Sequence, residues 1–384
     1  MAEVATNPLD STMLTVETPI NIDTAIYMLN PDDLPMLGGV NSDGYPLVGR
    51  QPVDNTVFYW LEDEFLAPRT LLNANITDVA TTLTVTANKG EAFAAGDAIN
   101  IGSEYMLITG VSNDTLTVTR GAVGSTATSH TGGDEILGLG TILSEGSIGD
   151  EQFTGRTKSS NYTQIWTSKI SMTRTAQKIP KYGMPGGELP RQTRKVLWAE
   201  AVNMEQALLY GAKYMSGNVR STGGIANFLT TNAIGNGASG DWLTVDEIAR
   251  MQQVTYDAGG TFEAIVAQAA AFGALDNLTS DRITQVDITD MRRGRARATV
   301  VMTRFGEVRL IANRYVKATD AFGLNPSSIT YRVFQPMVMQ PLAKTDDKDN
   351  WMFVAEGGFQ LKGERHQVHW TGLDITADYP AGLV

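Results

Sequence analysis

The run LPRQTRKVLWAEAVNMEQALLYGAK at residues 189–213 decides the fold class, because it is the longest stretch with a helical period. Its apolar residues recur at intervals of three and four and predict one stripe of an amphipathic helix: Leu197, Ala201, Met204 and Leu208. Pro190 near the start and Gly211 near the end are typical of helix boundaries. The sequence on both sides is mostly extended or rich in turns. We therefore expect an α+β protein with one dominant helix and sheets on either side of it.

Downstream of this helix, LTVDEIARMQQVTYDAG (243–259) predicts a second helix. Thr244 is placed to cap it, and Glu247 three residues later would complete a capping box. The alanine-rich run at 263–278 is either a buried strand leading into a helix or a single helix. Further strands are predicted where β-branched and aromatic residues recur, at 299–313, 328–344 and 350–373.

Residues 71–140 have a different texture from the rest of the chain. TTLTVT (81–86) and DTLTVTRG (114–121) alternate with period 2, and Ser-Asn-Asp at 112–114 is a tight-turn signal. A chain of 384 residues exceeds one usual core, so two or three lobes or one large insertion are expected. We interpret 71–140 as a small β-barrel or sandwich domain inserted between extended segments.

Residues 1–50 are acidic and interrupted by prolines, yet too apolar for a disordered tail. We interpret them as an arm that lies extended over its own body or over a neighbouring subunit. The acidity of the chain is concentrated here and in the next segments, since residues 1–140 hold 18 Asp and Glu against 4 Lys and Arg. A protein that grips nucleic acid is usually basic, so nucleic acid is not expected as a gripped ligand.

The sequence lacks the residues and motifs on which most enzyme active sites depend. There is no cysteine, and His130, His366 and His369 are the only histidines. The last two are interpreted as structural because a spacing of three on a strand points them to opposite faces, and His130 is expected at the surface of a turn. The glycine-rich GNGASGD (235–241) lacks the lysine of a phosphate-binding loop, and the nucleophile motif GxSxG is absent. No catalytic residue, cofactor or metal is therefore predicted.

Acidic clusters in two further segments have structural interpretations. The DDKD segment at 346–349 is interpreted as a solvated hairpin tip and not a calcium loop. Glu62 and Glu64 share one face of a predicted edge strand, outside any cleft. The sequence also has no secretory signal and no apolar run long enough to span a membrane, which predicts a soluble intracellular product.

Two groups of residues are candidate subunit contacts. Arg292, Arg293, Arg295 and Arg297 form the densest charge feature, interpreted as a charged loop at a subunit contact in preference to a nucleic-acid contact. Trp60 and Phe65 lie in NTVFYWLEDEFL (55–66), which predicts a strand. Because aromatic side chains are enriched at interface cores, they are candidates for contact with an adjacent subunit, and packing on their own body is the alternative.

The order of these parts resembles the major capsid proteins of tailed phages, with the Johnson or Hong Kong 97-type fold. The resemblance covers nearly the whole chain outside 71–140. The similar stretches are NTVFYWLEDE, SNYTQIWTSKISMTRTAQKIPKYG, RKVLWAEAVNMEQALLYG with VRSTGGIANFL, TRFGEVRLIANRYV, PLAKTDD and EGGFQLKGERHQVHWTGL.

The resemblance implies a major capsid protein that self-assembles into hexamers and pentamers, which form an icosahedral head shell enclosing phage DNA. It implies an N-terminal arm at 1–50, an E-loop at 51–70 and 141–165 around the inserted domain at 71–140, a peripheral domain at 166–260 with the spine helix at 189–213, an axial domain at 261–335 and a return to the peripheral domain at 336–384. Its implied partners are other copies, portal, scaffold and decoration proteins, and double-stranded DNA held by confinement, with no membrane. The implied location is the virion capsid, after synthesis in the host bacterial cytoplasm. A tail or other virion structural protein is the alternative function.

Overall fold

The structure is a computed structural model, which describes residues 34–38, 47–63, 67–87, 89–142, 156–179, 187–235, 242–273, 275, 283–286, 298–344 and 346–373. The chain divides into two compact units. The insert unit is Tyr59–Ser159, and the body unit consists of Met1–Phe58 with Ser160–Val384.

The insert unit is built from six antiparallel strands and two short 3₁₀ turns. Their bounds are β3 Arg69–Leu71, β4 Thr82–Thr84, β5 Asp97–Ile101, β6 Glu104–Ser112, β7 Thr115–Thr119 and β8 Glu135–Thr141, with η1 Gly90–Ala92 and η2 Ala122–Gly124. The sheet order is β3-β8-β5-β6-β7-β4. A bridge between Leu72 and Val85 joins the two outer strands and closes the sheet into a small barrel. Inward-facing apolar residues such as Ile99, Met106 and Leu116 fill its interior.

The chain crosses from the body unit to the insert unit and back within a two-stranded ribbon. The ribbon consists of β2 Val57–Glu62 and β9 Thr157–Tyr162. The residues of β2 alternate between buried and exposed, as expected for a strand with one covered face.

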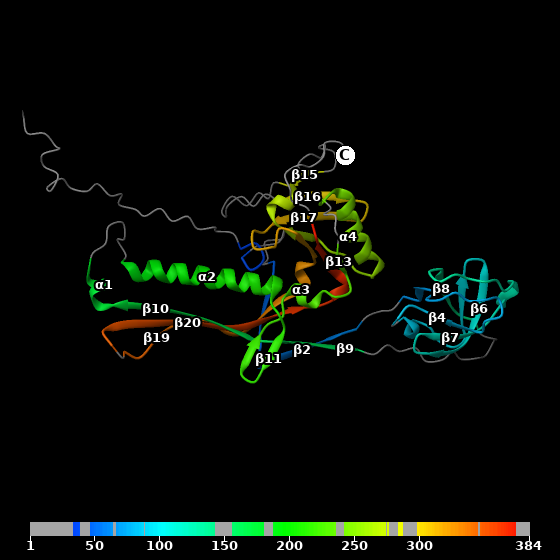
Figure 1. Ribbon diagram of the computed structural model, residues 1–384, viewed down its shortest axis with the longest axis horizontal. Helices are drawn as coiled ribbons and strands as arrows, with labels where there is room; N and C mark the ends of the chain where they lie inside the picture. Colours follow the sequence, from blue (N-terminus) through cyan, green and yellow to red (C-terminus); the bar gives the residue numbers. More distant parts are fainter. Residues whose placement is uncertain are drawn as a thin grey trace, which may run out of the picture. The chain divides into compact units, whose positions relative to one another are not determined.

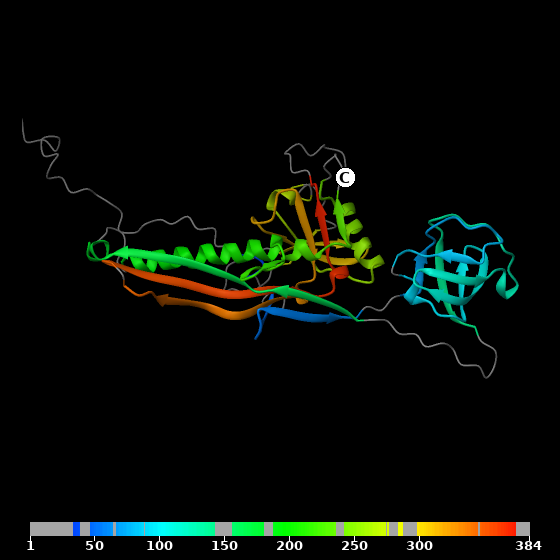
Figure 2. The same cartoon turned by 60° about the horizontal axis from the view of Figure 1, so that its bottom comes forward.

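The first layer of the body unit is a four-stranded sheet with a long helix along it (Figures 1 and 2). The sheet order is β1-β19-β20-β10. The bounds are β1 Gly49–Pro52, β10 Gln164–Thr173, β19 Ile329–Pro341, β20 Lys348–Leu361, α1 Arg174–Lys178 and α2 Glu188–Tyr210. Ile170, Met172 and Phe353 on the sheet pack with Leu189 and Val196 of α2. This apolar contact holds the helix against the sheet.

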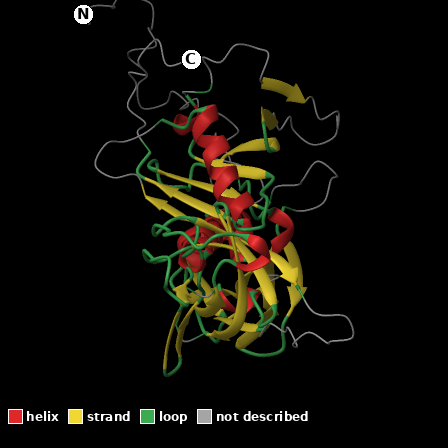
Figure 3. Ribbon diagram, turned by 90° about the vertical axis from the view of Figure 1, so that its right-hand side faces the viewer, coloured by secondary structure: helices red, strands yellow, loops and turns green. Residues whose placement is uncertain are grey.

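The second layer is a seven-stranded sheet of order β13-β21-β18-β14-β17-β16-β15. The bounds are β13 Ala233–Gly235, β14 Ala264–Ala267, β15 Ile283–Val286, β16 Ala298–Thr303, β17 Gly306–Ala312, β18 Asp320–Leu324 and β21 Val368–Thr371. The other elements are α3 Ile225–Phe228, α4 Val245–Asp257, η3 Ala269–Phe272, η4 Pro326–Ser328, η5 Glu364–His366 and the hairpin strands β11 Tyr214–Ser216 and β12 Val219–Ser221. Strands predominate over helices among these elements (Figure 3).

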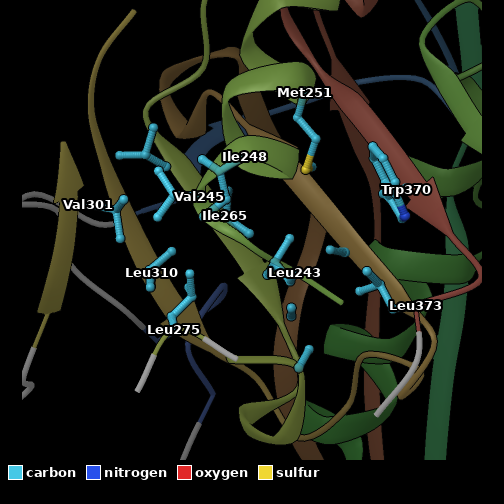
Figure 4. Packing of buried hydrophobic residues seen from close by; sticks show 14 of the residues in the cluster. Leu243, Val245, Ile248, Met251, Ile265, Leu275, Val301, Leu310, Trp370 and Leu373 are labelled. Atoms are coloured by element: carbon cyan, nitrogen blue, oxygen red, sulfur yellow. The ribbon is translucent and has the colours of Figure 1, made fainter. Parts of the chain in front are cut away.

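The core of this second layer lies between α4 and the sheet (Figure 4). Ile248 and Met251 of α4 face the strand residues Ile265, Leu310 and Trp370. The side chain of Thr244 accepts a hydrogen bond from the backbone N–H of Glu247 at 3.3 Å, so the predicted cap is present. The ambiguous run at 263–278 contains a buried strand, β14, followed by the short turn η3.

The stripe predicted for the long helix is wrong in its detail. Leu197 is 40% exposed, whereas Glu200 and Glu205 of α2 are buried. The reason is that both carboxylates have hydrogen-bond donors inside the body unit, beginning with the hydroxyl of Ser168 for Glu200. Polar groups with such partners can face a core, and hydropathy alone does not reveal them.

Candidate assembly surfaces

The ribbon strand β2 separates its aromatic residues onto two faces. Trp60 is 7% exposed, and its indole N–H donates to the Glu62 carboxylate at 3.0 Å. Tyr59 and Leu61 are on the opposite face and are 56% and 64% exposed. The Nζ of Lys158 lies 3.9 Å from the centre of the Tyr59 ring. The exposed apolar surface of this strand therefore comes from Tyr59 and Leu61, two residues that were not among the sequence candidates.

The predicted contact residues differ in their surroundings. The contact role of Trp60 stays a prediction. Its side chain is buried within the single chain, which agrees with the alternative that it packs on its own body. Phe65 and the four arginines at 292, 293, 295 and 297 lie outside the described residues. The period-2 alternation of VFYWLE was the signal that would have separated Tyr59 and Leu61 from Trp60.

Asn161 anchors the end of β9 in the body unit. Its side chain is fully buried, with the amide nitrogen 3.1 Å from Thr222 Oγ1, 2.9 Å from the Gly223 carbonyl and 2.6 Å from the Phe359 carbonyl. Its amide oxygen accepts from the backbone N–H groups of Tyr162 and Gly223, both at 2.8 Å. One side chain thus ties β9 to β20 and to the loop before α3.

Glu356 on β20 fixes a second point beside it. The hydroxyl of Thr163 donates to this carboxylate at 2.6 Å, and Nη2 of Arg220 lies 2.9 Å from it. All three side chains are buried or largely buried. An ion pair that is shielded from water holds its geometry better than an exposed one, so the segment carrying Arg220 has a fixed base.

Part of the predicted arm lies on its own body unit. The buried Glu205 carboxylate on α2 accepts from the backbone N–H of Met36 and of Leu37, both at 2.9 Å, and from the Asn313 amide at 2.8 Å. The Met36 side chain is fully buried in the core. Residues 34–38 are therefore docked against α2, and the preceding part of the arm lies outside the described residues.

The insert unit holds a buried ionic network around Glu104. Both carboxylate oxygens of Glu104 bind the Arg120 guanidinium, at 2.7 and 2.8 Å, and His130 Nε2 lies 3.0 Å away. Burial by itself raises the pKa of Glu104, but hydrogen bonds from Arg120, from the Thr128 N–H, from His130 and from the Gly121 N–H lower it to about 2. The prediction that His130 lies at the surface is wrong, because its ring turns inward onto Glu104.

Two further titratable groups of the body unit, His369 and Tyr210, meet at Asp320. Burial lowers the pKa of His369, which stacks on Phe322 and lies 3.4 Å from Asp320. Tyr210 donates to the same Asp320 at 3.0 Å, and burial raises the pKa of its hydroxyl. In the described part of the chain, no group of three or more His, Asp or Glu is placed to hold a metal ion. None of the described helices is both long and apolar enough to cross a membrane.

The comparisons with known proteins identify the family. A family model described as SU10 major capsid protein matches residues 6–374. The chain belongs to this family. The subunit is therefore a phage major capsid protein, and its copies form the head shell. This family consists of structural capsid proteins and is not a class of enzymes, and the match excludes the tail-protein alternative.

Solved structures give the same fold at low sequence identity. A chain from Gordonia phage Cozz has a TM-score of 0.51 and 12% identity, covering 97% of this chain and 97% of that one. A chain from the capsid of the native GTA particle has a TM-score of 0.51 and 8% identity, covering 96% and 100%. A chain from Mycobacterium phage Adephagia has a TM-score of 0.50 and 10% identity, covering 97% and 100%. The capsid protein therefore has the Hong Kong 97-type fold. No curated protein matches its sequence.

Proposed function

We propose that this capsid protein forms hexamers and pentamers that close into an icosahedral head around double-stranded phage DNA. The observation that carries the proposal is the family match over residues 6–374. The likeness to a capsid chain of the native GTA particle over 96% of the subunit supports it. With a formal net charge of −12, the subunit would hold DNA by enclosing it.

The elements take roles within this proposal. The β2–β9 ribbon belongs to the E-loop, and α2 is the spine helix of the peripheral domain. We assign the axial domain to the lobe built on the seven-stranded sheet and α4. Relative to the predicted range 261–335, this lobe also includes α4, β13 and β21. The insert unit is an added domain whose own core and buried network let it fold as a separate module.

The proposal also includes partners other than copies of this chain. Portal, scaffold and decoration proteins are the expected additional components of such a head. The subunit itself has a structural role without catalysis. It is made in the host bacterial cytoplasm and remains in the virion.

Negative-stain electron microscopy of the purified subunit tests the proposed assembly. Closed shells, or rings with six-fold and five-fold symmetry, are the expected products. Three-fold rings or stacked tubes of fixed diameter would contradict the proposed shell. If the purified subunit stays monomeric, it is produced together with the other head proteins of the phage. Heads that form without this chain would overturn the proposal.

Deletion of residues 2–30 tests the role of the arm. Residues 34–38 remain docked on α2 in this variant, so a folded subunit is expected. Assembly into shells should be strongly reduced. Normal shells from the truncated subunit would refute the proposed role of the arm.

A further inference from the structure

The hairpin of β11 and β12 follows directly after α2 and projects from the body unit (Figure 1). Its two three-residue strands pair Tyr214 with Ser221 and Ser216 with Val219. Among the described residues these strands form a sheet of their own and pair with no other strand. An isolated two-stranded hairpin is at best marginally stable in water.

One face of this hairpin is uncharged and exposes two large apolar side chains. Cross-strand pairs lie on the same side of a sheet, so Tyr214, Ser216, Val219 and Ser221 share a face. Tyr214 is 55% exposed and Val219 is 66% exposed. The opposite face carries Met215 and Arg220. The first of these faces, formed by Tyr214, Ser216, Val219 and Ser221, is referred to below as the hairpin face.

The hairpin has a firm base despite its exposure. Arg220 is paired with the buried Glu356, and the Lys213 ammonium donates to the Ser160 hydroxyl at 3.0 Å. At the same base, Gly211 and Gly224 approach closely, with the Gly224 N–H donating to the Gly211 carbonyl at 2.7 Å. A surface that is held in place loses little conformational entropy on binding.

We propose that the hairpin face is an interface covered by a second copy of this chain in the assembled head. The occupant follows from two observations. The family forms shells from copies of its own chain, so each subunit is flanked by other copies. The hairpin face carries no charged side chain, and interfaces between identical subunits are more apolar than ordinary surface. Burial of Tyr214 and Val219 would stabilise both the contact and the hairpin itself.

The test compares two valine-to-aspartate variants made with the full set of phage head proteins. Val219→Asp places a charge on the hairpin face, and Val79→Asp is the matched control, since Val79 is 78% exposed in the insert unit. We expect Val219→Asp to reduce assembled heads by about tenfold or more, whereas Val79→Asp assembles like the wild type. A tenfold reduction in assembly corresponds to roughly 1.4 kcal/mol. Removing an unpaired carboxylate from water at the interface costs at least that much. Equal head yields from Val219→Asp and the wild type would overturn the proposal.

A second measurement keeps the test decisive if Val219→Asp fails to fold. Benzoylphenylalanine is placed at position 214, where an aromatic side chain is already exposed, and purified heads are irradiated. The expected result is a covalent dimer of the chain on a denaturing gel, and mass spectrometry should map one end to the hairpin. Heads that give only the monomer, or cross-links only to a different protein, would overturn the proposal.

Discussion

Replacement of Glu104 by glutamine is expected to destabilise the insert unit by about 3 kcal/mol. The pKa of Glu104 falls from 4.5 to about 2 on folding, and each pKa unit corresponds to about 1.4 kcal/mol of interaction with the ionised carboxylate. Glutamine cannot carry the charge, and it leaves the Arg120 guanidinium buried without its counter-ion. For a unit of roughly 100 residues, this loss corresponds to a fall in melting temperature of about 12–24 °C.

The effect should depend on pH in one direction. Because the folded pKa lies below the unfolded one, the ionised Glu104 stabilises the insert unit fully above about pH 5. That contribution is lost as the pH falls from about 4.5 toward 2. The difference in unfolding free energy between the wild type and Glu104→Gln should therefore be largest near neutral pH and shrink in acid.

Hydrogen exchange of peptides from β5 and β6 in the full chain measures this stability without interference from the body unit. Glu135→Gln is the matched control, because Glu135 is an exposed partner of Arg69 on the same barrel and should contribute less than about 1 kcal/mol. A Glu104→Gln variant that is as protected as Glu135→Gln, or a difference from the wild type that does not change with pH, would refute the reasoning.

Three further substitutions test the body unit. Asn161→Ala should lower its free energy of unfolding by about 2–4 kcal/mol, because the buried N–H groups of Tyr162 and Gly223 lose their acceptor; a loss below about 1 kcal/mol in urea titration would contradict this. Thr244→Ala should cost about 1 kcal/mol through the lost cap of α4 and Thr244→Ser much less, and thermal melts that do not distinguish the two variants would argue against the cap. Gly224→Ala should sharply reduce soluble folded subunit, since a Cβ there would lie 2.5 Å from the Ala207 carbonyl oxygen and 2.6 Å from the Gly211 nitrogen. A wild-type yield and melting temperature for Gly224→Ala would show that the backbone moves aside.

Local signals in the sequence are sufficient for the two longest helices and for several strands. The period of the run at 189–213 and the cap at Thr244 predict α2 and α4, since both depend on residues within one or two turns. The β-branched residues of the run at 299–313 likewise predict the strands found there, β16 and β17. Element type is therefore readable wherever the deciding contacts are close in the chain.

Contacts between distant residues were not readable in this way. Glu205 is buried because of donors at residues 36, 37 and 313, and a helical pattern contains no trace of them. The turn-like sequence around His130 predicts a surface position, whereas its partner Glu104 lies 26 residues away on β6. Which side chains of β2 and of the β11–β12 hairpin are exposed depends on the face that the rest of the chain covers. Composition alone does not reveal this face.

The parallel pairing of β1 with β19 has a consequence for synthesis on the ribosome. Gly49 is aligned with Thr330, 281 residues later in the chain. At bacterial translation rates of about 5–20 residues per second, β1 waits roughly 15–55 s for its partner to emerge. The insert unit, in contrast, is contiguous and can fold during that interval. The four-stranded sheet is completed only after β20 at Lys348–Leu361 has been made, so a nascent chain lacks a finished body unit until then.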